Sequence, residues 1–436
     1  MPPMDRRLQL RYQVLVKSQM NAASRTAAGP SLLPQGTHAA AVTQAAWRFY
    51  NNPRVSLAAL IQPLREIGLK EAAQSSSEFV LLAHDWSKLD YGTHSSKQDR
   101  CQLTHRSDIG YDLTTALLID AHDGAPLVPM EMHLKTAHAV HSTSTSPPVV
   151  TDHHLDQLQP IMDSSREWNL PRRVVHVIDR EADSLGHYRD WQAAEHLFLV
   201  RSNDRRVRWN DQSWKISEIV GHCESSGYFQ GDRPVEYHGK PAIQQVAEVN
   251  IVLDRRHKTQ INGKQYAIAG PPVPLRLVMS RILDETGQVL STWTLLTNVP
   301  ADKADAGQVA LWYYWRWRIE SFYKLLKSHG QEAEYWQQES GEAIARRLLV
   351  ATMACVVVWR LQRETTPQAA ETRRILIRLS GRQMKHKVES TAPALLAGYF
   401  VLLSMLQLLE QTDHTLDQLK SLADNALPFI NPSGNV

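Results

Sequence analysis

One stretch of the sequence decides the fold class: Val174-Val175-His176-Val177-Ile178-Asp179. Valine and isoleucine dominate this stretch, which is typical of a buried strand, and an acid follows it. A second apolar run, at residues 79–83, leads through His84 into Asp85. Ligand and metal sites of α/β folds lie at the carboxyl ends of their strands, so both acids are candidate site residues. Either acid alone is more often a turn residue, because aspartate favours turns.

Further strands and helices are predicted around these two runs. Residues 111–119 and 127–134 alternate like strands and flank an Asp-Gly turn signal, which predicts a hairpin. Residues 152–168 and 185–194 have a helical pattern, and residues 197–200 form another predicted strand. Together these elements predict an α/β layered domain with a mixed sheet.

The remaining sequence suggests three regions. Residues 203–300 hold strand-like segments at 245–253, 275–283 and 291–299 without a long helical pattern, which favours a β-rich insertion. Residues 303–362 are strongly helical. With 436 residues the chain is too long for one core. We expect a helical region at 1–75, an α/β domain at 76–365 that includes the insertion, and a helical region at 366–436.

Composition and charge restrict the class of protein. The chain is 43% hydrophobic and 21% charged with a net charge of +3, as expected for a soluble protein. Cationic segments at 1–80 and 373–387 suit a phosphate backbone, although a solvated basic face explains each equally well. Cys101, Cys223 and Cys355 are too widely spaced for a disulfide framework or a zinc motif. The apolar runs at 348–359 and 394–409 are too short to cross a bilayer, so no membrane association is expected.

A third acid lies in a helical stretch that also carries cations. The stretch is Tyr313-Tyr314-Trp315-Arg316-Trp317-Arg318-Ile319-Glu320-Ser321-Phe322-Tyr323-Lys324-Leu325-Leu326-Lys327. On one continuous helix, Tyr313, Arg316, Glu320 and Lys327 would form a single stripe about 21 Å long. The alternative is an exposed helix face on which Arg316 and Glu320 form an ordinary pair four residues apart.

Three carboxylates with neighbouring cations suit phosphodiester chemistry. Two divalent ions about 4 Å apart can activate a nucleophile and neutralise a leaving oxygen. Carboxylates are the hard ligands that Mg²⁺ or Mn²⁺ prefers. We therefore expect Asp85 to bridge two Mg²⁺ ions, with Asp179 completing one site and Glu320 the other. Arg316 and Lys327 would then hold the substrate strand by its phosphates.

The spacing of Tyr313, Arg316, Glu320 and Lys327 resembles the Tyr-Arg-Glu-Lys signature of the insertion-sequence-four family of DDE transposases. Three other segments resemble motifs of that family: Trp47-Arg48-Phe49-Tyr50-Asn51-Asn52-Pro53-Arg54-Val55-Ser56, Asp179-Arg180-Glu181-Ala182-Asp183 and Phe198-Leu199-Val200-Arg201-Ser202. The resemblance covers about residues 40–365 and is weaker towards the C-terminus.

The resemblance implies a ribonuclease-H-like catalytic core with a β-rich insertion, a helical N-terminal DNA-binding region and a helical C-terminal region that could support dimerisation. It implies a homodimer that pairs two transposon ends on double-stranded DNA in the bacterial cytoplasm, at the nucleoid. Members of the family nick one strand, form and reopen a hairpin, and join the 3′-OH to target DNA.

Two further residues receive a role from this resemblance. Trp293 matches a tryptophan that stacks on a flipped base, and Arg201 matches an arginine that contacts DNA. A strand tryptophan packed in the insertion and a solvated strand-end cation are the respective alternatives. Two other functions stay open for the chain: a catalytically silent DNA-binding regulator of transposition, and a nuclease of the same fold that joins nothing.

Overall fold

The computed structural model describes residues 5–21, 36–145, 154–237, 240–261, 264–328, 330–385, 388–411, 415–418 and 420–421. The chain divides into two compact units, which are treated separately. One unit comprises Ser56–Tyr323, and the other combines Met1–Val55 with Lys324–Val436. This division by contacts does not follow the boundaries expected at residues 75 and 365. Contacts alone do not assign functions, so the functional regions stay a prediction.

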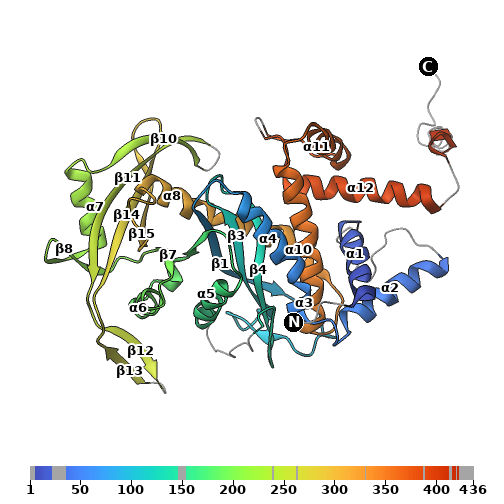
Figure 1. The fold of residues 1–436 in the computed structure, drawn as a ribbon, viewed down its shortest axis with the longest axis horizontal. Coiled ribbons are helices and arrows are strands. Elements are labelled where there is room, and N and C mark those ends of the chain that lie inside the picture. Colours follow the sequence, from blue (N-terminus) through green and yellow to red (C-terminus); the bar gives the residue numbers. More distant parts are fainter. Residues whose placement is uncertain are drawn as a thin grey trace. The chain divides into compact units, whose positions relative to one another are not determined.

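A large mixed sheet organises the Ser56–Tyr323 unit (Figure 1). Its first half has the order β5-β4-β3-β1-β6-β7. β1 pairs antiparallel with β3, which pairs antiparallel with β4, whereas β6 runs parallel to both β1 and β7. The bounds are β1 (Phe79–Asp90), β2 (Cys101–Gln102), β3 (Ile109–Asp120), β4 (Pro126–Lys135), β5 (Val140–Ser142), β6 (Arg173–Ile178) and β7 (Leu197–Arg201).

The β-rich region continues the same sheet. β15 pairs antiparallel with β7, and the order then runs β15-β14-β11-β8-β9, giving 13 strands within the described residues. β12 and β13 form a separate hairpin. The bounds are β8 (Arg206–Trp209), β9 (Gln212–Lys215), β10 (Gln230–Tyr237), β11 (Lys240–Leu253), β12 (His257–Ile261), β13 (Lys264–Ile268), β14 (Val273–Leu283) and β15 (Val289–Thr297). The helix α7 (Ile216–Ser225) also lies in this region, where no long helical pattern is predicted.

Helices of this unit pack on the sheet and complete its core. Gly68 of α4 allows a close approach to β4, because a Cβ there would lie 2.7 Å from the Met130 Sδ atom and 2.7 Å from the Val128 Cγ2 atom. The helices are α3 (Leu57–Leu60), α4 (Gln62–Gln74), η1 (His154–Gln157), α5 (Leu158–Glu167), η2 (Arg180–Ala182), α6 (Leu185–Ala193), α8 (Ala306–Trp315) and α9 (Trp317–Lys327). The unit boundary falls within α9.

The other unit is helical in its described residues. Its elements are α1 (Arg6–Asn21), α2 (Gly36–Tyr50), η3 (Ala333–Tyr335), α10 (Gly341–Arg363), α11 (Pro367–Ser380) and α12 (Ala392–Gln411). Arg346 of α10 is buried and donates hydrogen bonds to the carbonyl oxygens of Tyr50 (2.8 Å) and Val55 (2.7 Å), which fixes the end of α2 against α10. Among the helices that the structure describes, none is both long and apolar enough to cross a bilayer.

The predicted mixed α/β fold is confirmed, and three details of the predicted elements are wrong. The hairpin after Asp120 forms, with Gly124 at a φ of +72° in its turn. Asp85 does not follow a strand but lies within β1, which continues to Asp90. Tyr313 and Glu320 do not share one helix, because α8 ends at Trp315 and α9 begins at Trp317. The third wrong detail is α7. Residues 152 and 153 of the helix predicted at 152–168 lie outside the described residues.

Candidate active site

Strand register brings Asp85 and Asp179 together. β1 and β6 run in parallel, with His84 opposite Ile178. The residue that follows each of these two is an aspartate, Asp85 and Asp179. Residues opposite each other on parallel strands point to the same face of the sheet. Asp179 also caps η2, where its Oδ1 atom accepts a hydrogen bond of 2.7 Å from the Arg180 backbone N–H. This local cap fixes the carboxylate at the sheet edge.

The guanidinium of Arg316 lies between the three predicted acids. Its Nη1 atom donates to Asp85 Oδ2 at 3.0 Å, and its Nη2 atom donates to Glu320 Oε1 at 2.8 Å. The Nη2 atom is also 3.8 Å from Asp179 Oδ2. The Arg316 side chain is only 6% exposed, whereas the acids are 18% (Asp85), 37% (Asp179) and 29% (Glu320) exposed, so a buried guanidinium lies in a partially exposed cluster. Sequence positions 85, 179 and 320 are therefore gathered around one cation.

Arg316 lies at the break between α8 and α9. Its backbone N–H bonds to Tyr313 O at 3.1 Å, three residues back, and the Ile319 N–H bonds to Arg316 O in the same three-residue pattern. Such bonds tighten the helix locally. The Nε atom of Arg316 is buried and has no hydrogen-bond partner among the described residues. One donor of the cluster is therefore unsatisfied within the described residues.

Two tyrosines support the aspartates. The Tyr313 hydroxyl donates to Asp179 Oδ1 at 3.0 Å, and the Tyr323 hydroxyl donates to the Asp85 backbone oxygen at 2.7 Å. The sequence prediction missed Tyr323. Its position seven residues after Arg316, which is two helical turns, is the signal that could have identified it.

Burial and charge set the protonation of the acids. Burial raises the pKa of Asp85 to about 6, an effect that Arg316 only partly offsets. Although burial opposes the shift, Arg316, the Arg180 N–H and the Tyr313 hydroxyl lower the pKa of Asp179. Burial also disfavours the charge on Arg316, but Asp85 and the other neighbouring acids raise its pKa. The cluster thus contains one charged guanidinium and three carboxyl groups, so Arg316 alone cannot neutralise all of the acids.

The donor set fits a hard divalent cation only if Arg316 withdraws. Three carboxylates are suitable ligands for Mg²⁺ or Mn²⁺, and the elevated pKa of Asp85 indicates that additional positive charge there would be stabilising. Within the described residues, however, no group of three His, Cys, Asp or Glu side chains is arranged to hold a metal ion directly. The Arg316 guanidinium contacts all three acids.

Trp293 and Arg201 lie on neighbouring strands beside Tyr313. The rings of Trp293 and Tyr313 meet edge to face, with centroids 6.0 Å apart and planes at 69°. Trp293 belongs to β15. Arg201 is the last residue of β7 and pairs with Leu295 of β15. Arg201 contributes to lowering the pKa of Asp179. Both residues are half-buried and so keep surface for a ligand.

Lys327 belongs to the other, helical unit. Its Nζ atom pairs with Glu334 Oε1 at 3.0 Å. The sequence prediction missed Glu334, and no sequence pattern marked it. Lys327 therefore has an acidic partner within the chain that a phosphate would have to replace.

A row of buried histidines lies behind Asp85. His84 Nε2 is 2.9 Å from His176 Nδ1, and the rings of His176 and His196 are 5.2 Å apart. Burial lowers the pKa of His84 to about 3 and lowers the pKa of His176 well below its ordinary value. These side chains are neutral in the folded protein, which excludes a role as cationic phosphate ligands at neutral pH.

Comparison with known proteins adds one family match. A family model described as a transposase DDE domain matches residues 132–357, which includes Asp179 and Glu320 but begins after Asp85. A piggyBac transposase, solved by cryo-EM in a synaptic complex with hairpin DNA, aligns with 95% of this chain and 74% of its own. The TM-score is 0.38 and the identity 8%, too distant to support an argument about this chain. No curated protein matches the chain.

The buried histidines predict that acid destabilises the protein. Below about pH 6.5 the unfolded chain binds protons at His84 and His176 that the folded chain excludes, so the free energy of unfolding falls as pH falls. The loss approaches about 2 kcal/mol per histidine by pH 5, and Asp85, with its raised pKa, offsets about 1 kcal/mol. Urea denaturation at pH 7 and pH 5 measures this difference.

Two variants control this experiment. Replacing both histidines in His84→Phe/His176→Phe should flatten the pH dependence, whereas His105→Asn, at an exposed position, should leave it unchanged. Equal stability of the wild-type protein at both pH values would contradict the assignment of neutral buried histidines.

Proposed function

The chain belongs to the transposase DDE domain family, and on this basis we propose that it cuts and joins DNA by two-metal phosphoryl transfer at Asp85, Asp179 and Glu320. It is a DDE-type transposase. The observation that carries the proposal is the convergence of these three acids on one buried guanidinium. Acids so distant in sequence, sharing a partially exposed cluster, suit a site that exchanges one cation for others.

The three acids would hold two Mg²⁺ ions, with Mn²⁺ as a possible substitute. Bound there, such ions would activate the attacking hydroxyl or water and neutralise charge on the leaving oxygen. Asp85 would be the ligand shared by the two ions; it lies on β1 beside the end of β6, which Asp179 directly follows. Tyr313 and Tyr323 would keep Asp179 and the β1 backbone in place through the hydrogen bonds described above.

Arg316 would change partners when substrate binds. Its guanidinium now donates to Asp85 and Glu320, and the two non-bridging oxygens of a DNA phosphate can accept the same two donors. Moving to the phosphate would free the carboxylates while the arginine keeps a charged partner. Arg201 and Trp293 flank this position, where they would contact the strand and stack on a base.

The finer parts of the proposal follow the Tyr-Arg-Glu-Lys resemblance. The ribonuclease-H-like arrangement is supported by the strand order β4-β3-β1-β6-β7, with three antiparallel strands followed by two parallel ones. Residues 1–75 would recognise the inverted repeats of an insertion sequence. Residues 366–436 would help two copies pair the ends, and Lys327 would hold a phosphate after leaving Glu334. Cleavage would proceed through a hairpin before joining to target DNA.

Glu320→Gln tests the catalytic role of the acids. The amide keeps a hydrogen-bond acceptor for Arg316 but loses the charge, so cleavage of DNA carrying the element's ends with Mg²⁺ should fall by at least about 10³-fold. End binding, measured by gel shift, should remain close to wild type. The control is Glu285→Gln, an exposed acid in the β14–β15 turn, which should cut normally.

Each outcome of this assay identifies a function. Full cleavage by Glu320→Gln would refute the site. Binding without any cleavage by the wild-type protein would instead indicate a silent regulator. Cleavage without joined products would indicate a nuclease.

A separate prediction concerns base stacking by Trp293. Trp293→Ala should reduce hairpin formation by roughly 5- to 150-fold, because stacking is worth about 1–3 kcal/mol per base, while nicking of the first strand changes little. Trp293→Phe retains an aromatic face and should recover most of the hairpin yield. Denaturing gels resolve both products. Equal losses of nicking and hairpin formation in Trp293→Ala would mean that the ring merely supports Tyr313.

A further inference from the structure

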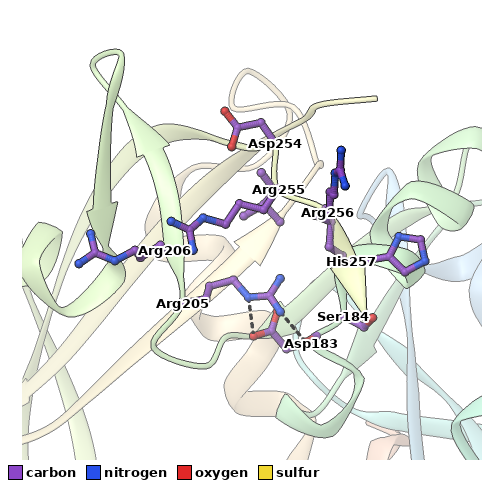
Figure 2. Close-up of a pocket in the computed structure, with 10 residues that line it drawn as sticks. Asp183, Ser184, Arg205, Arg206, Asp254, Arg255, Arg256 and His257 are labelled. Carbon is purple, nitrogen blue, oxygen red and sulfur yellow. Dashed lines mark hydrogen bonds and ion pairs between the residues drawn. The ribbon is translucent and has the colours of Figure 1, made fainter. Parts of the chain in front are cut away.

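A second, strongly basic site lies outside the acid cluster. A pocket of about 300 Å³ opens between the start of α6, the β7–β8 connection and the β11–β12 turn. Figure 2 shows its arginines arriving in two pairs, Arg205 and Arg206 from one segment and Arg255 and Arg256 from the other. We infer that this pocket binds backbone phosphates of DNA, as an anchor separate from the acid cluster. The inference rests on the proposed function in taking DNA as the substrate.

The two acids that line the pocket are already neutralised. Asp183 pairs with Arg205, whose Nε atom is 3.3 Å from Asp183 Oδ2 (Figure 2). Asp183 also accepts hydrogen bonds of 2.7 Å from the Tyr188 hydroxyl and 2.7 Å from the Asn203 N–H. Asp254 accepts a hydrogen bond of 2.9 Å from Arg208 Nε. Neither acid is therefore available to the other arginines of the pocket.

Three arginines of the pocket consequently retain free positive charge. Arg206, Arg255 and Arg256 are exposed, and none of them forms an ion pair within the described part of the chain. Arg206 Nη1 donates a hydrogen bond of 3.5 Å to the Ser213 backbone oxygen, which leaves its charge without an acidic partner. Clustered guanidinium groups at a concave surface raise the local potential and attract polyanions.

Hydrogen bonds from Arg189 hold the backbone of the β11–β12 turn. Arg189 is buried beneath it, and its Nη2 atom donates to the backbone oxygens of Arg255 (2.9 Å) and Gly270 (3.1 Å). Arg189 Nε donates to Pro271 O at 2.9 Å. A turn fixed in this way loses little conformational entropy on binding, so Arg255 and Arg256 are pre-positioned.

The start of α6 adds hydrogen-bond donors to the same wall. Ser184 is the N-cap residue, yet its side chain makes no capping hydrogen bond. Its hydroxyl and the positive end of the α6 dipole therefore face a pocket already lined by arginines. A helix end and guanidinium groups together are the usual protein donors to phosphate oxygens.

The lining favours the phosphate backbone over bases. Among the residues described as lining the pocket, none is Phe, Tyr or Trp, so the site lacks the aromatic platform on which bases stack. Its donors are guanidinium groups beside a helix N-terminus, the groups that most often contact phosphate oxygens. The pocket should therefore bind DNA without regard to sequence and with a strong salt dependence.

Salt-dependent DNA binding tests the inference. A fluorescent random-sequence 30-base-pair duplex is titrated with full-length protein in EDTA, at NaCl concentrations from 50 to 200 mM, and anisotropy gives the affinity. The binding constant falls as salt rises, and each lost phosphate contact makes the plot of log K against log salt concentration less steep by about 0.9. The plot for Arg255→Gln/Arg256→Gln should be less steep by one to two such steps, and the variant should bind about tenfold more weakly at low salt.

Two matched variants separate a defined pocket from general charge. Arg255→Lys/Arg256→Lys keeps both charges and should retain the wild-type slope. Arg106→Gln/Arg233→Gln removes two exposed cations elsewhere in the same unit and should also retain it. A wild-type slope in the Arg255→Gln/Arg256→Gln variant, or an equal loss in the Arg106→Gln/Arg233→Gln variant, would overturn the inference.

A further arm tests a small anion as the ligand. If inorganic phosphate or a free nucleotide bound the wild-type pocket while the glutamine variant kept full DNA affinity, the pocket would not be a DNA anchor. The whole assay runs without Mg²⁺ and without cleavage. A changed slope in the glutamine variant, together with no cutting by the wild-type protein in the separate Mg²⁺ cleavage assay, would support the pocket and refute the proposed catalysis.

Discussion

The placement of one buried guanidinium among three acids governs the candidate site. Arg316 contacts Asp85, Asp179 and Glu320 and is itself shielded from water. Removing one partner from such a cluster leaves a charge buried without compensation, which typically costs several kcal/mol. The acids and the arginine therefore depend on each other in the free protein. Under the proposed mechanism, a cation that binds the acids would displace the arginine toward another anion.

The surrounding fold serves this arrangement. Parallel pairing of β1 and β6 sets two aspartates side by side, and the antiparallel strand β3 holds β1 straight past Asp85. The break between α8 and α9 places Arg316 at a helix junction rather than on a regular helix face. The β-rich region extends the same sheet through β15, which brings Trp293 against Tyr313. The basic pocket belongs to this extension, so chemistry and anchoring would be joined by one continuous sheet.

Local patterns in the sequence predicted much of this, and long-range contacts account for the rest. The β-branched run before Asp179 and the Asp-Gly turn are short-range signals, and both elements form as expected. The extension of β1 beyond Asp85 depends on pairing with β3, because Trp86, Ser87 and Lys88 give no continuous apolar pattern. The helix break at Arg316 has no glycine or proline to mark it, and contacts with distant acids accompany it. The basic pocket joins segments about fifty residues apart, which no periodicity reveals.

Binding of Mn²⁺, followed by electron paramagnetic resonance, tests the central claim most directly. The measurement counts bound ions in the wild-type protein with a DNA end, and in Asp85→Asn, Asp179→Asn and Glu320→Gln. The account predicts two ions in the wild-type complex and a loss of at least one in every variant, with the largest loss for the bridging Asp85. Unchanged stoichiometry and affinity in all three variants would contradict it, because the acids gathered around Arg316 would then not be the metal ligands.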